Sequence, residues 1–565
     1  MSKRRLETDQ QPSTSRKKAQ RDDVVGPRPS QRVGFCYISK LSDEVLLHVF
    51  QELPLEQILV CQSVSQRWQH ISTDPELWKK LYFMRFVKPR LAHIHSRTRT
   101  RLATRDWWRN ERTQTLDEPR KDWKRLFKIR HNWHRGRCGI SEMDISHSPI
   151  RHGSHKEHLS MSFSNAPSVA AAVPLVQFDG KIFVVADKEV GLRAWDIDNV
   201  ENEKRKLVGY RPFREYEDGW KLGAPSALGL DAREQFSDIV IGFDSGGIMI
   251  LRLHASDGLE GQGFGFARRC IVPPKHAPQT IQHVAYSHPY LLTLDLDNNL
   301  CAYQFDASSA LSLGVPRHLS TLRAQTLNGP CHLTLRKPRV GSQTVTAAIA
   351  YSMPLFHGGW SVGIQEVEVS PNPTDGIVMT RLGMCVPAFY ELAVHPESTV
   401  SQRTSNMPVE SPTSISYSHP YLLTSHRDNT LTLYIARSTE KEITIGQPRR
   451  LWGHTTGVAR AGVGGRGRAV SVSQIGGEVR VWELESMAVA ASNADIGIIE
   501  STVVGCVESV QVEDALRIDK DLYMEQQSLR IPTAVEWIGF DEEKVLVLTR
   551  DEERDKNVMF YDFTV

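Results

Sequence analysis

The sequence has few cysteines and no apolar stretch long enough to cross a membrane. Its eight cysteines are scattered through 565 residues, with no pair spaced as C-x-x-C and no neighbouring histidines at zinc spacing. This distribution excludes a disulfide framework and a structural zinc site, and it is typical of reduced intracellular thiols. The apolar runs stay below the roughly 18 residues of a membrane span, and the N-terminus lacks the apolar core of a signal peptide. We therefore expect a soluble intracellular protein.

A catalytic motif in the right structural context is also missing. Residues 359–363 match G-x-S-x-G, but a nucleophile elbow needs a helix after its serine, and Ser361 is followed by the alternating pattern of a strand. The glycines within residues 462–467 match G-x-G-x-x-G, yet they precede a strand rather than open a helix. We interpret the nearby His454 as a structural hydrogen-bonding residue. The sequence therefore predicts no enzyme activity, no catalytic residue, no cofactor and no metal site.

Acidic residues are scarce in the N-terminal quarter of the chain. Up to Arg137 there are 30 lysines and arginines against 15 aspartates and glutamates, whereas the rest of the chain carries 39 against 51. A basic segment joined to an acidic body suggests different partners for the two parts. Residues 1–34 contain too few large apolar groups to fold alone, so we expect them to form a disordered basic tail.

Two basic clusters lie in this tail, at residues 3–5 (KRR) and 16–18 (RKK). The ten residues between them give a separation that resembles a bipartite nuclear import signal, whose two halves bind two sites on the import receptor. The alternative is a solvated basic tail without a receptor. We expect the protein in the nucleus and the cytoplasm.

Helical periodicity dominates residues 38–86. Apolar residues recur at i, i+3, i+4 and i+7 through Leu46–Leu53, which defines one face of a helix that begins at Ser42. Pro54 ends this helix, and similar patterns predict two or three further helices up to Phe86. So few short helices form a core near the lower limit for independent folding, and such a unit often completes its burial against a partner.

This stretch resembles the F-box, the helical motif by which substrate receptors of Skp–cullin–F-box ubiquitin ligases bind the Skp adaptor. The matching residues are Leu41, Glu44, Leu46, Phe50, Leu53, Leu59, Val64, Trp68, Asp74, Pro75, Leu77 and Trp78. Ser42 departs from the usual proline, and Ser65 from a common cysteine. We assign residues 35–87 to this domain. The resemblance implies that the adaptor binds Leu41, Leu46, Phe50, Leu53, Leu59, Val64 and Trp68.

The alternative for this stretch is an ordinary three-helix core without a partner.

Residues 88–140, which follow, form a second basic stretch that we interpret as a helical linker. It contains Trp107 and Trp108 among the arginines Arg97, Arg99, Arg101, Arg105 and Arg109. Such a mixture can bind nucleic acid through phosphate contacts and stacking, but we favour the linker because tryptophan is mostly buried. The spacing of Trp123, Leu126 and Phe127 resembles the linker helix of F-box proteins with WD repeats.

From about residue 160 the pattern changes to short alternating strands bounded by Asp, Asn and Gly. The sequence YSHPYLLT occurs at residues 286–293 and again at 417–424, and each copy continues into an Asp-Asn turn. Asn298 and Asn429 can supply the left-handed residue that a tight hairpin needs. The copies are 131 residues apart, which suits about three repeats of roughly 40–45 residues.

Seven turn-then-strand units end in similar patterns. They are Gly191–Asp196, Gly247–Leu251, Leu300–Tyr303, Val362–Val367, Leu431–Tyr434, Gly477–Trp482 and Val558–Asp562. The sixth follows Gly453-His454 and resembles a WD repeat, although Gly476 stands where the repeat carries its turn aspartate. We therefore expect a seven-bladed WD-repeat-like β-propeller over residues 141–565, in a multidomain chain of the α+β class. A strand within residues 158–178 should close the ring beside Val545–Leu548.

The combined resemblance implies a non-catalytic substrate receptor. It would link the Skp adaptor, and through it the cullin and RING subunits, to a protein target, with no membrane partner and no nucleic acid. Arg460, Arg466 and Arg468 lie in a glycine-rich connection and are suited to pair with an acidic or phosphorylated target segment. The alternative for these arginines is solubility alone. Two other functions stay open: an F-box scaffold outside ubiquitin transfer, and a nuclear nucleic-acid-associated propeller.

We predict that alanine at all six basic positions of the tail clusters moves a fluorescent fusion out of the nucleus, because the import receptor needs both halves of the signal. The positions are Lys3, Arg4, Arg5, Arg16, Lys17 and Lys18. The measurement is the nuclear-to-cytoplasmic fluorescence ratio in living cells, with Arg28→Ala and Arg32→Ala in the same tail as the control. An unchanged ratio would reduce the clusters to a solvated tail.

Overall fold

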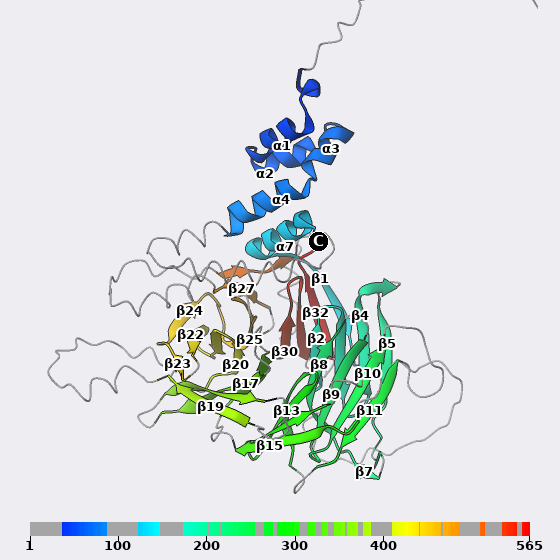
Figure 1. Cartoon of the computed structure of the whole chain (residues 1–565), viewed down its shortest axis with the longest axis vertical. Coiled ribbons are helices and arrows are strands. Elements are labelled where there is room, and N and C mark those ends of the chain that lie inside the picture. The colour runs from blue at the N-terminus through cyan, green and yellow to red at the C-terminus, as the bar shows by residue number, and fades with distance from the viewer. Residues whose placement is uncertain are drawn as a thin grey trace, which may run out of the picture. The chain divides into compact units, whose positions relative to one another are not determined.

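The computed structural model describes residues 37–87, 122–146 and 173–565, the last range with gaps, of which 386–409, 485–508 and 515–533 are the longest. The chain divides into two compact units, Met1–Leu77 and Trp78–Val565. The first contains short helices, whereas the second consists mainly of strands (Figure 1).

Several features expected from the sequence fall outside the described residues. These are both basic clusters of the tail, the arginine- and tryptophan-rich residues 97–109, Gly476 and Arg466. Within the part of the chain that the structure describes, no helix is long and apolar enough to span a membrane.

Short helices build the first unit. They are α1 (Asp43–Gln51), α2 (Leu55–Cys61), α3 (Gln66–Ser72) and α4 (Pro75–Tyr82), preceded by the single turn η1 (Tyr37–Lys40). Side-chain caps begin two of them: the Ser65 hydroxyl accepts a hydrogen bond from the Trp68 amide at 3.3 Å, and Asp74 Oδ1 accepts one from the Glu76 amide at 2.8 Å. The α4 helix runs across the boundary between the two units.

The core of the first unit is small and apolar. Leu46, Phe50 and Ile58 are at most 1% exposed. The ring of Phe50 also meets the ring of Trp68 edge to face, with centroids 5.3 Å apart. Helices α1 and α2 therefore bury one side of their apolar residues inside the unit.

The second unit contains seven sheets that form the blades of a propeller, which confirms the predicted blade number; their strands pair antiparallel, except for β1 with β29 in the seventh. Blade 1 has β2 (Leu175–Asp179), β3 (Ile182–Asp187), β4 (Gly191–Glu201) and β5 (Lys204–Arg211); blade 2 has β8 (Pro225–Ala232), β9 (Phe236–Phe243), β10 (Ile248–His254) and β11 (Phe266–Val272); blade 3 has β12 (Ile281–Ser287), β13 (Tyr290–Asp295), β14 (Asn299–Gln304) and β15 (Arg317–Arg323); blade 4 has β16 (Cys331–Arg336), β17 (Val345–Pro354), β18 (Trp360–Val369) and β19 (Ile377–Met384).

The remaining blades carry two additions to the four-strand pattern. Blade 5 has β20 (Ser414–Ser418), β21 (Tyr421–Ser425), β22 (Thr430–Ser438), β23 (Ile443–Ile445) and β24 (Arg449–Trp452); blade 6 has β25 (Val458–Val463), β26 (Arg468–Ser473), β27 (Val479–Glu483) and β28 (Ser509–Gln511); blade 7 has β30 (Ala534–Phe540), β31 (Lys544–Arg550), β32 (Lys556–Asp562), β1 (Arg137–Asp144) and β29 (Glu513–Asp514). A separate hairpin joins β6 (Tyr216–Glu217) to β7 (Trp220–Lys221). Each of the seven units identified in the sequence overlaps the third strand of its blade.

The first strands of neighbouring blades contact one another in a closed circle, from β2 through β8, β12, β16, β20 and β25 to β30 and back to β2. Apolar clusters fill the spaces between blades, because the middle strands of a blade bury both of their faces. One such cluster joins Phe183 and Trp195 of blade 1 to Leu546 and Phe560 of blade 7. Apolar packing thus holds neighbouring blades to one another, while strand pairing holds each blade together.

The strand that closes the ring is β1, which pairs antiparallel with β32. The expectation of a closing strand within residues 158–178 beside Val545–Leu548 is wrong. Val545–Leu548 belongs to β31, and both edges of β31 are already paired, with β30 and β32. Leu175–Asp179 instead forms the first strand of blade 1. The propeller therefore begins at Arg137 rather than at residue 141.

The two YSHPYLLT copies lie at the same position in blades 3 and 5, each spanning the turn between the first and second strands. Asn298 and Asn429 have φ angles of 64° and 66°, which confirms the left-handed turn residues. The copies are two blades apart rather than three, because inserted connections lengthen these blades beyond the usual repeat.

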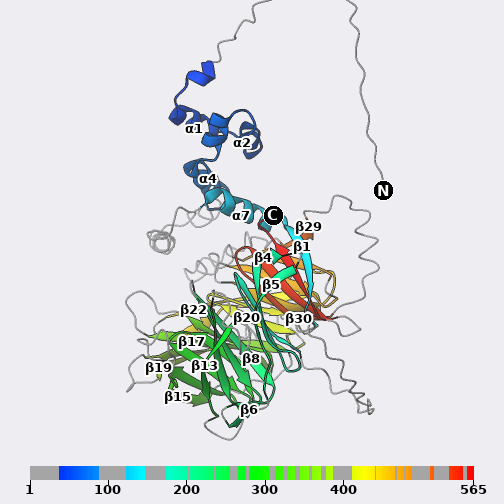
Figure 2. The ribbon, with the colours of Figure 1, turned by 90° about the vertical axis from the view of Figure 1, so that its right-hand side faces the viewer.

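Helix α7 (Trp123–Arg135) packs on blade 7 directly before β1. The Trp133 ring stacks on Phe563, with centroids 3.8 Å apart, and its Nε1 donates a hydrogen bond to the Glu542 carbonyl at 2.8 Å. Asn132 Nδ2 donates to the Phe563 carbonyl at 2.8 Å. In both views α7 lies beside the C-terminus (Figures 1 and 2).

The other side of α7 meets aromatic residues from the start of the second unit. Phe127 lies 5.5 Å from Trp78 and 5.3 Å from Phe86, measured between ring centroids, and Phe86 belongs to the single turn η2 (Phe83–Val87). Burial and nearby arginines, including Arg85, lower the pKa of His131 in this cluster to about 4. This histidine is therefore neutral at physiological pH.

We predict that Trp133→Ala lowers the free energy of unfolding of the second unit by about 3–5 kcal/mol, because the substitution removes a buried aromatic side chain. The measurement is urea denaturation followed by circular dichroism of the β-strands. The control is Trp220→Ala, whose side chain in the β6–β7 hairpin is 45% exposed. Equal losses in the two variants would contradict the role of Trp133.

Candidate functional site

The surface of the first unit carries a group of exposed apolar side chains. They are Ile38, Leu41, Val45, Val49, Leu59, Val60 and Val64, which are between 38% and 65% exposed. They come from η1, α1, α2 and the turns beside these elements. Isolated exposed apolar residues are common, but seven within one small helical unit indicate a surface that another molecule covers.

The seven residues expected to bind the adaptor divide into core and surface. Leu46 and Phe50 are core residues, and Leu53 and Trp68 are half-buried. Leu41, Leu59 and Val64 are exposed. The periodicity of α1 identified an apolar face, but it did not tell which part of a wide apolar stripe faces inward.

Three further exposed apolar residues are absent from the set that the sequence assigned to adaptor binding: Val45, Val49 and Val60. Val45 and Val49 are four residues apart on α1 and thus form a second stripe beside Leu46 and Phe50. This spacing was the available signal.

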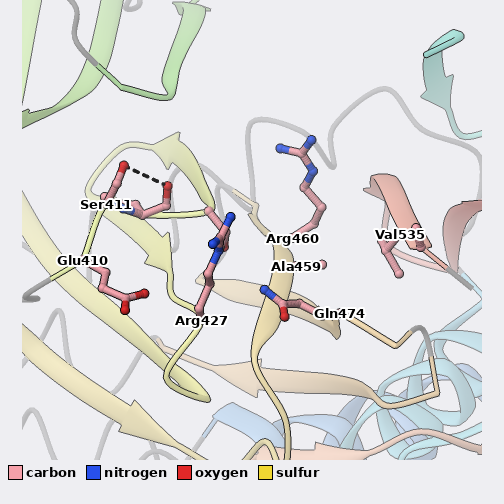
Figure 3. Close-up of a pocket in the computed structure, with 10 residues that line it drawn as sticks. Glu410, Ser411, Arg427, Ala459, Arg460, Gln474 and Val535 are labelled. Carbon is pink, nitrogen blue, oxygen red and sulfur yellow. Dashed lines mark hydrogen bonds between the residues drawn. The ribbon is translucent and has the colours of Figure 1, made fainter. Parts of the chain in front are cut away.

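A pocket of about 670 Å³ lies on the propeller between blades 5, 6 and 7 (Figure 3). Its lining residues are Glu410, Ser411, Pro412, Thr413, Arg427, Ala459, Arg460, Gln474, Ala534 and Val535. They come from the segment before β20, the β21–β22 hairpin, β25, the turn after β26 and the start of β30. Because β20, β25 and β30 belong to the inner circle of strands, the pocket lies at one mouth of the central channel.

Hydrogen bonds fix the wall of this pocket. The Thr413 hydroxyl donates to the Val458 carbonyl at 2.8 Å, and the Gln474 amide donates to the Gly457 carbonyl at 2.7 Å. The Val458 amide donates in turn to the His426 carbonyl at 2.9 Å. The backbone beside both pocket arginines is therefore held in place before any partner binds.

The structure separates the arginines that the sequence grouped together. Arg460 lies on β25 and lines the pocket, whereas Arg468 begins β26 at the other end of the hairpin. The Arg468 guanidinium is 4.5 Å from the Trp133 ring centroid and donates to the Glu542 carbonyl at 3.3 Å, and burial lowers its pKa to about 10. The expectation that these arginines share one flexible loop is therefore corrected. Arg460 lies near the start of β25, whereas Arg468 follows the turn between β25 and β26, so the two residues lie at opposite ends of the blade. Target binding by Arg460 stays a prediction.

Residues of the apparent enzyme motifs have structural contacts. Ser361 is buried in β18 and donates to the Cys385 carbonyl at 2.7 Å. Gly462 lies in β25, and Gly464 and Gly467 lie between β25 and β26. Among the described residues, no three histidine, cysteine, aspartate or glutamate side chains are grouped to hold a metal ion.

His454 stabilises blade 6 from within. Its Nε2 lies 2.6 Å from the Ser471 hydroxyl, which also accepts a hydrogen bond from Trp482 Nε1 at 2.8 Å. Burial lowers the pKa of His454, so the ring is neutral and Ser471 links it to the tryptophan. Glu478, which sequence reasoning missed, lies 3.3 Å from His454 Nδ1 and supplies the carboxylate expected of a turn aspartate.

Comparison with known families now assigns the chain. A model described as the F-box protein pof12 beta-propeller matches residues 161–564. The chain belongs to this family. A second model, described as F-box-like, matches residues 38–84. The helical unit and the propeller of this pof12-family protein thus correspond to two recognised domains.

Two F-box proteins and one solved structure are among the individual proteins similar to this chain. The chain is 24% identical over 453 residues to F-box protein pof12 of Schizosaccharomyces pombe, covering 79% of this chain and 84% of that protein. It is 48% identical over 46 residues to F-box protein dre-1 of Caenorhabditis elegans, covering 8% of this chain and 5% of that protein. A crystal structure of RRP9 WD40 repeats matches 68% of this chain and 91% of its own, with 10% identity and a TM-score of 0.36.

We predict that the double variant Leu46→Ala, Phe50→Ala unfolds the F-box unit rather than altering its surface, because each truncation of a buried core residue costs about 2–5 kcal/mol. Hydrogen exchange measured by mass spectrometry should show fast exchange throughout α1–α3. Val49→Ala, an exposed position on the same helix, is the control and should exchange like the parent. Slow exchange in the double variant would contradict the core assignment.

Proposed function

We propose that this protein is the substrate-recognition subunit of a Skp–cullin–F-box ubiquitin ligase. The F-box unit binds the Skp adaptor, which connects it to the cullin and RING subunits, and the propeller binds a protein target. Membership of a family named for an F-box and a propeller supports this division of roles.

The observation that carries the proposal is the exposed apolar surface of the F-box unit, above all Val49, Val60 and Val64. Burying a large apolar side chain against a partner contributes about 1.5–3 kcal/mol, and a few such anchors dominate most interfaces. The core of the unit is too small to bury these residues, so they are exposed until a partner covers them. An apolar groove on the adaptor fits this surface.

This role requires no chemistry from the chain itself. Ubiquitin transfer takes place on other subunits, and the receptor raises the effective concentration of target lysines near the charged ubiquitin carrier. The reaction is accelerated by holding two molecules together. Action in both the nucleus and the cytoplasm belongs to the same proposal and rests on the basic clusters of the tail.

We predict that Val49→Ser, Val60→Ser and Val64→Ser together reduce co-purification of the Skp adaptor by about tenfold or more, because three exposed anchors are lost while the core is kept. The measurement is adaptor recovery from cells that express the tagged full chain. The matched control is Leu296→Ser with Val315→Ser, two exposed apolar positions of the propeller.

Equal recovery from the triple variant and the control would overturn the adaptor surface. Hydrogen exchange of α1–α3 should match the parent in both variants, which separates loss of binding from unfolding. Proteins that accumulate on the parent chain when the proteasome is inhibited identify the targets, and they should stay bound to the triple variant, whose propeller is unchanged.

A further inference from the structure

The pocket between blades 5, 6 and 7 lies at the end of the propeller opposite helix α7. Arg427 and Gln474 lie in the turns that lead into β22 and β27, the third strands of their blades. Phe563, against which α7 stacks, directly follows β32, the third strand of blade 7. Because the third strands of a propeller run in the same direction, their starts and ends lie on opposite faces. The pocket mouth is therefore not covered by α7.

Two guanidinium groups in this pocket make no direct ion pair with a described residue. Neither Arg427 nor Arg460 makes a side-chain hydrogen bond or ion pair to any residue that the structure describes. Their side chains project in the same direction in the close-up, and Glu410 lies on the side of Arg427 away from Arg460 (Figure 3).

Arg460 is partly removed from water. Burial lowers the pKa of its guanidinium, and the Glu536 carboxylate offsets part of this effect. Glu536 is itself paired with Arg550, so it does not satisfy the hydrogen-bonding capacity of Arg460. A partly desolvated guanidinium without a direct partner gains more from an arriving anion than a fully hydrated one.

The charge of the pocket selects the kind of anion. Arg427 and Arg460 contribute two positive charges and Glu410 one negative charge, so the lining carries a net charge of one. A single carboxylate neutralises this charge, whereas a phosphate monoester near neutral pH carries about two negative charges and meets the Glu410 carboxylate as well. A carboxylate also matches the planar fork of a guanidinium.

We propose that this pocket binds the side-chain carboxylate of an aspartate or glutamate within a target segment. The proposal rests on the receptor function above and specifies the target class for the propeller. The Arg427 and Arg460 guanidinium groups hold the carboxylate, and the side-chain amide of Gln474 is a further hydrogen-bond donor in the same pocket.

Two exposed apolar residues lie on the same face of the propeller as the pocket. Trp452, at the end of β24, pairs with Thr430, the first residue of β22, and the turn that holds Arg427 lies just before β22. The Trp452 side chain is 66% exposed. Ile475 follows Gln474 and is 55% exposed. An aromatic side chain and an arginine pair at one rim fit a segment in which acidic and apolar residues are neighbours.

The test begins with random dodecapeptides displayed on phage and selected on the purified full chain. Peptides bound by the parent should be enriched in aspartate and glutamate beside apolar residues, and Arg427→Gln with Arg460→Gln should abolish this enrichment. Arg317→Gln with Arg323→Gln, two exposed arginines on the outer strand of blade 3, removes the same two charges outside the pocket and should leave the enrichment unchanged.

The selected peptide is then synthesised in four forms for fluorescence anisotropy: the parent, its amide counterpart with glutamine or asparagine, a phosphoserine form and a form with an amidated C-terminus. The amide form, and either single arginine variant, should weaken binding by about tenfold to a hundredfold, the usual value of a charge-assisted hydrogen bond. Glu410→Gln should improve binding of the phosphoserine form more than that of the parent peptide. Trp452→Ala should weaken both.

Several outcomes would overturn the proposal. Selection without acidic enrichment removes the carboxylate site, and phosphoserine binding tighter than the parent assigns a phosphate site instead. Loss of binding on C-terminal amidation assigns a chain terminus. Co-purification of the adaptor is measured for the same protein. If the adaptor binds but the selected peptides are not enriched in acidic residues, the carboxylate site alone is rejected. If the peptides are enriched but the adaptor does not bind, the receptor function alone is rejected.

Discussion

The pairing of β1 with β32 is the constraint on which the propeller depends. It joins the beginning and the end of the second unit in one sheet, from Gly139 opposite Asp562 to Asp144 opposite Asn557. Without this strand the third strand of blade 7 would have a bare edge, and the apolar cluster between blades 7 and 1 would lose its support. The entropic cost of joining distant segments grows only with the logarithm of their separation, so the apolar area buried between blades outweighs it.

A single glycine between α7 and β1 determines where α7 lies relative to this strand pair. Gly136 ends the helix with φ at 67°, and a Cβ atom there would lie 2.2 Å from the Gln511 carbonyl oxygen. Any other residue is excluded by both the backbone angle and the close approach. Because the turn is so tight, the helix is directed back over blade 7, where Trp133 stacks on Phe563.

Blades 2 and 6 satisfy their buried polar groups in different ways, which agrees with the weak WD signature along the chain. Blade 6 uses His454, Ser471 and Trp482, whereas blade 2 buries an ion pair between Arg252 and Asp238, at 2.6 Å. Both arrangements leave few unpaired groups in the interior. The propeller face opposite α7 differs, because there Arg427 and Arg460 make no direct ion pair with a described residue and can serve recognition.

The sequence by itself determined the F-box, the number of blades and the third strand of each, because these depend on local periodicity and turn residues such as Asn298 and Asn429. Only the tertiary structure decided which strand closes the ring, since many segments have strand character and pairing is a long-range property. It also decided that Leu46 and Phe50 form the core while Val49 and Val60 are exposed, and that Arg460 and Arg468 lie apart. Burial and spatial proximity depend on packing between elements, which periodicity along one chain segment does not encode.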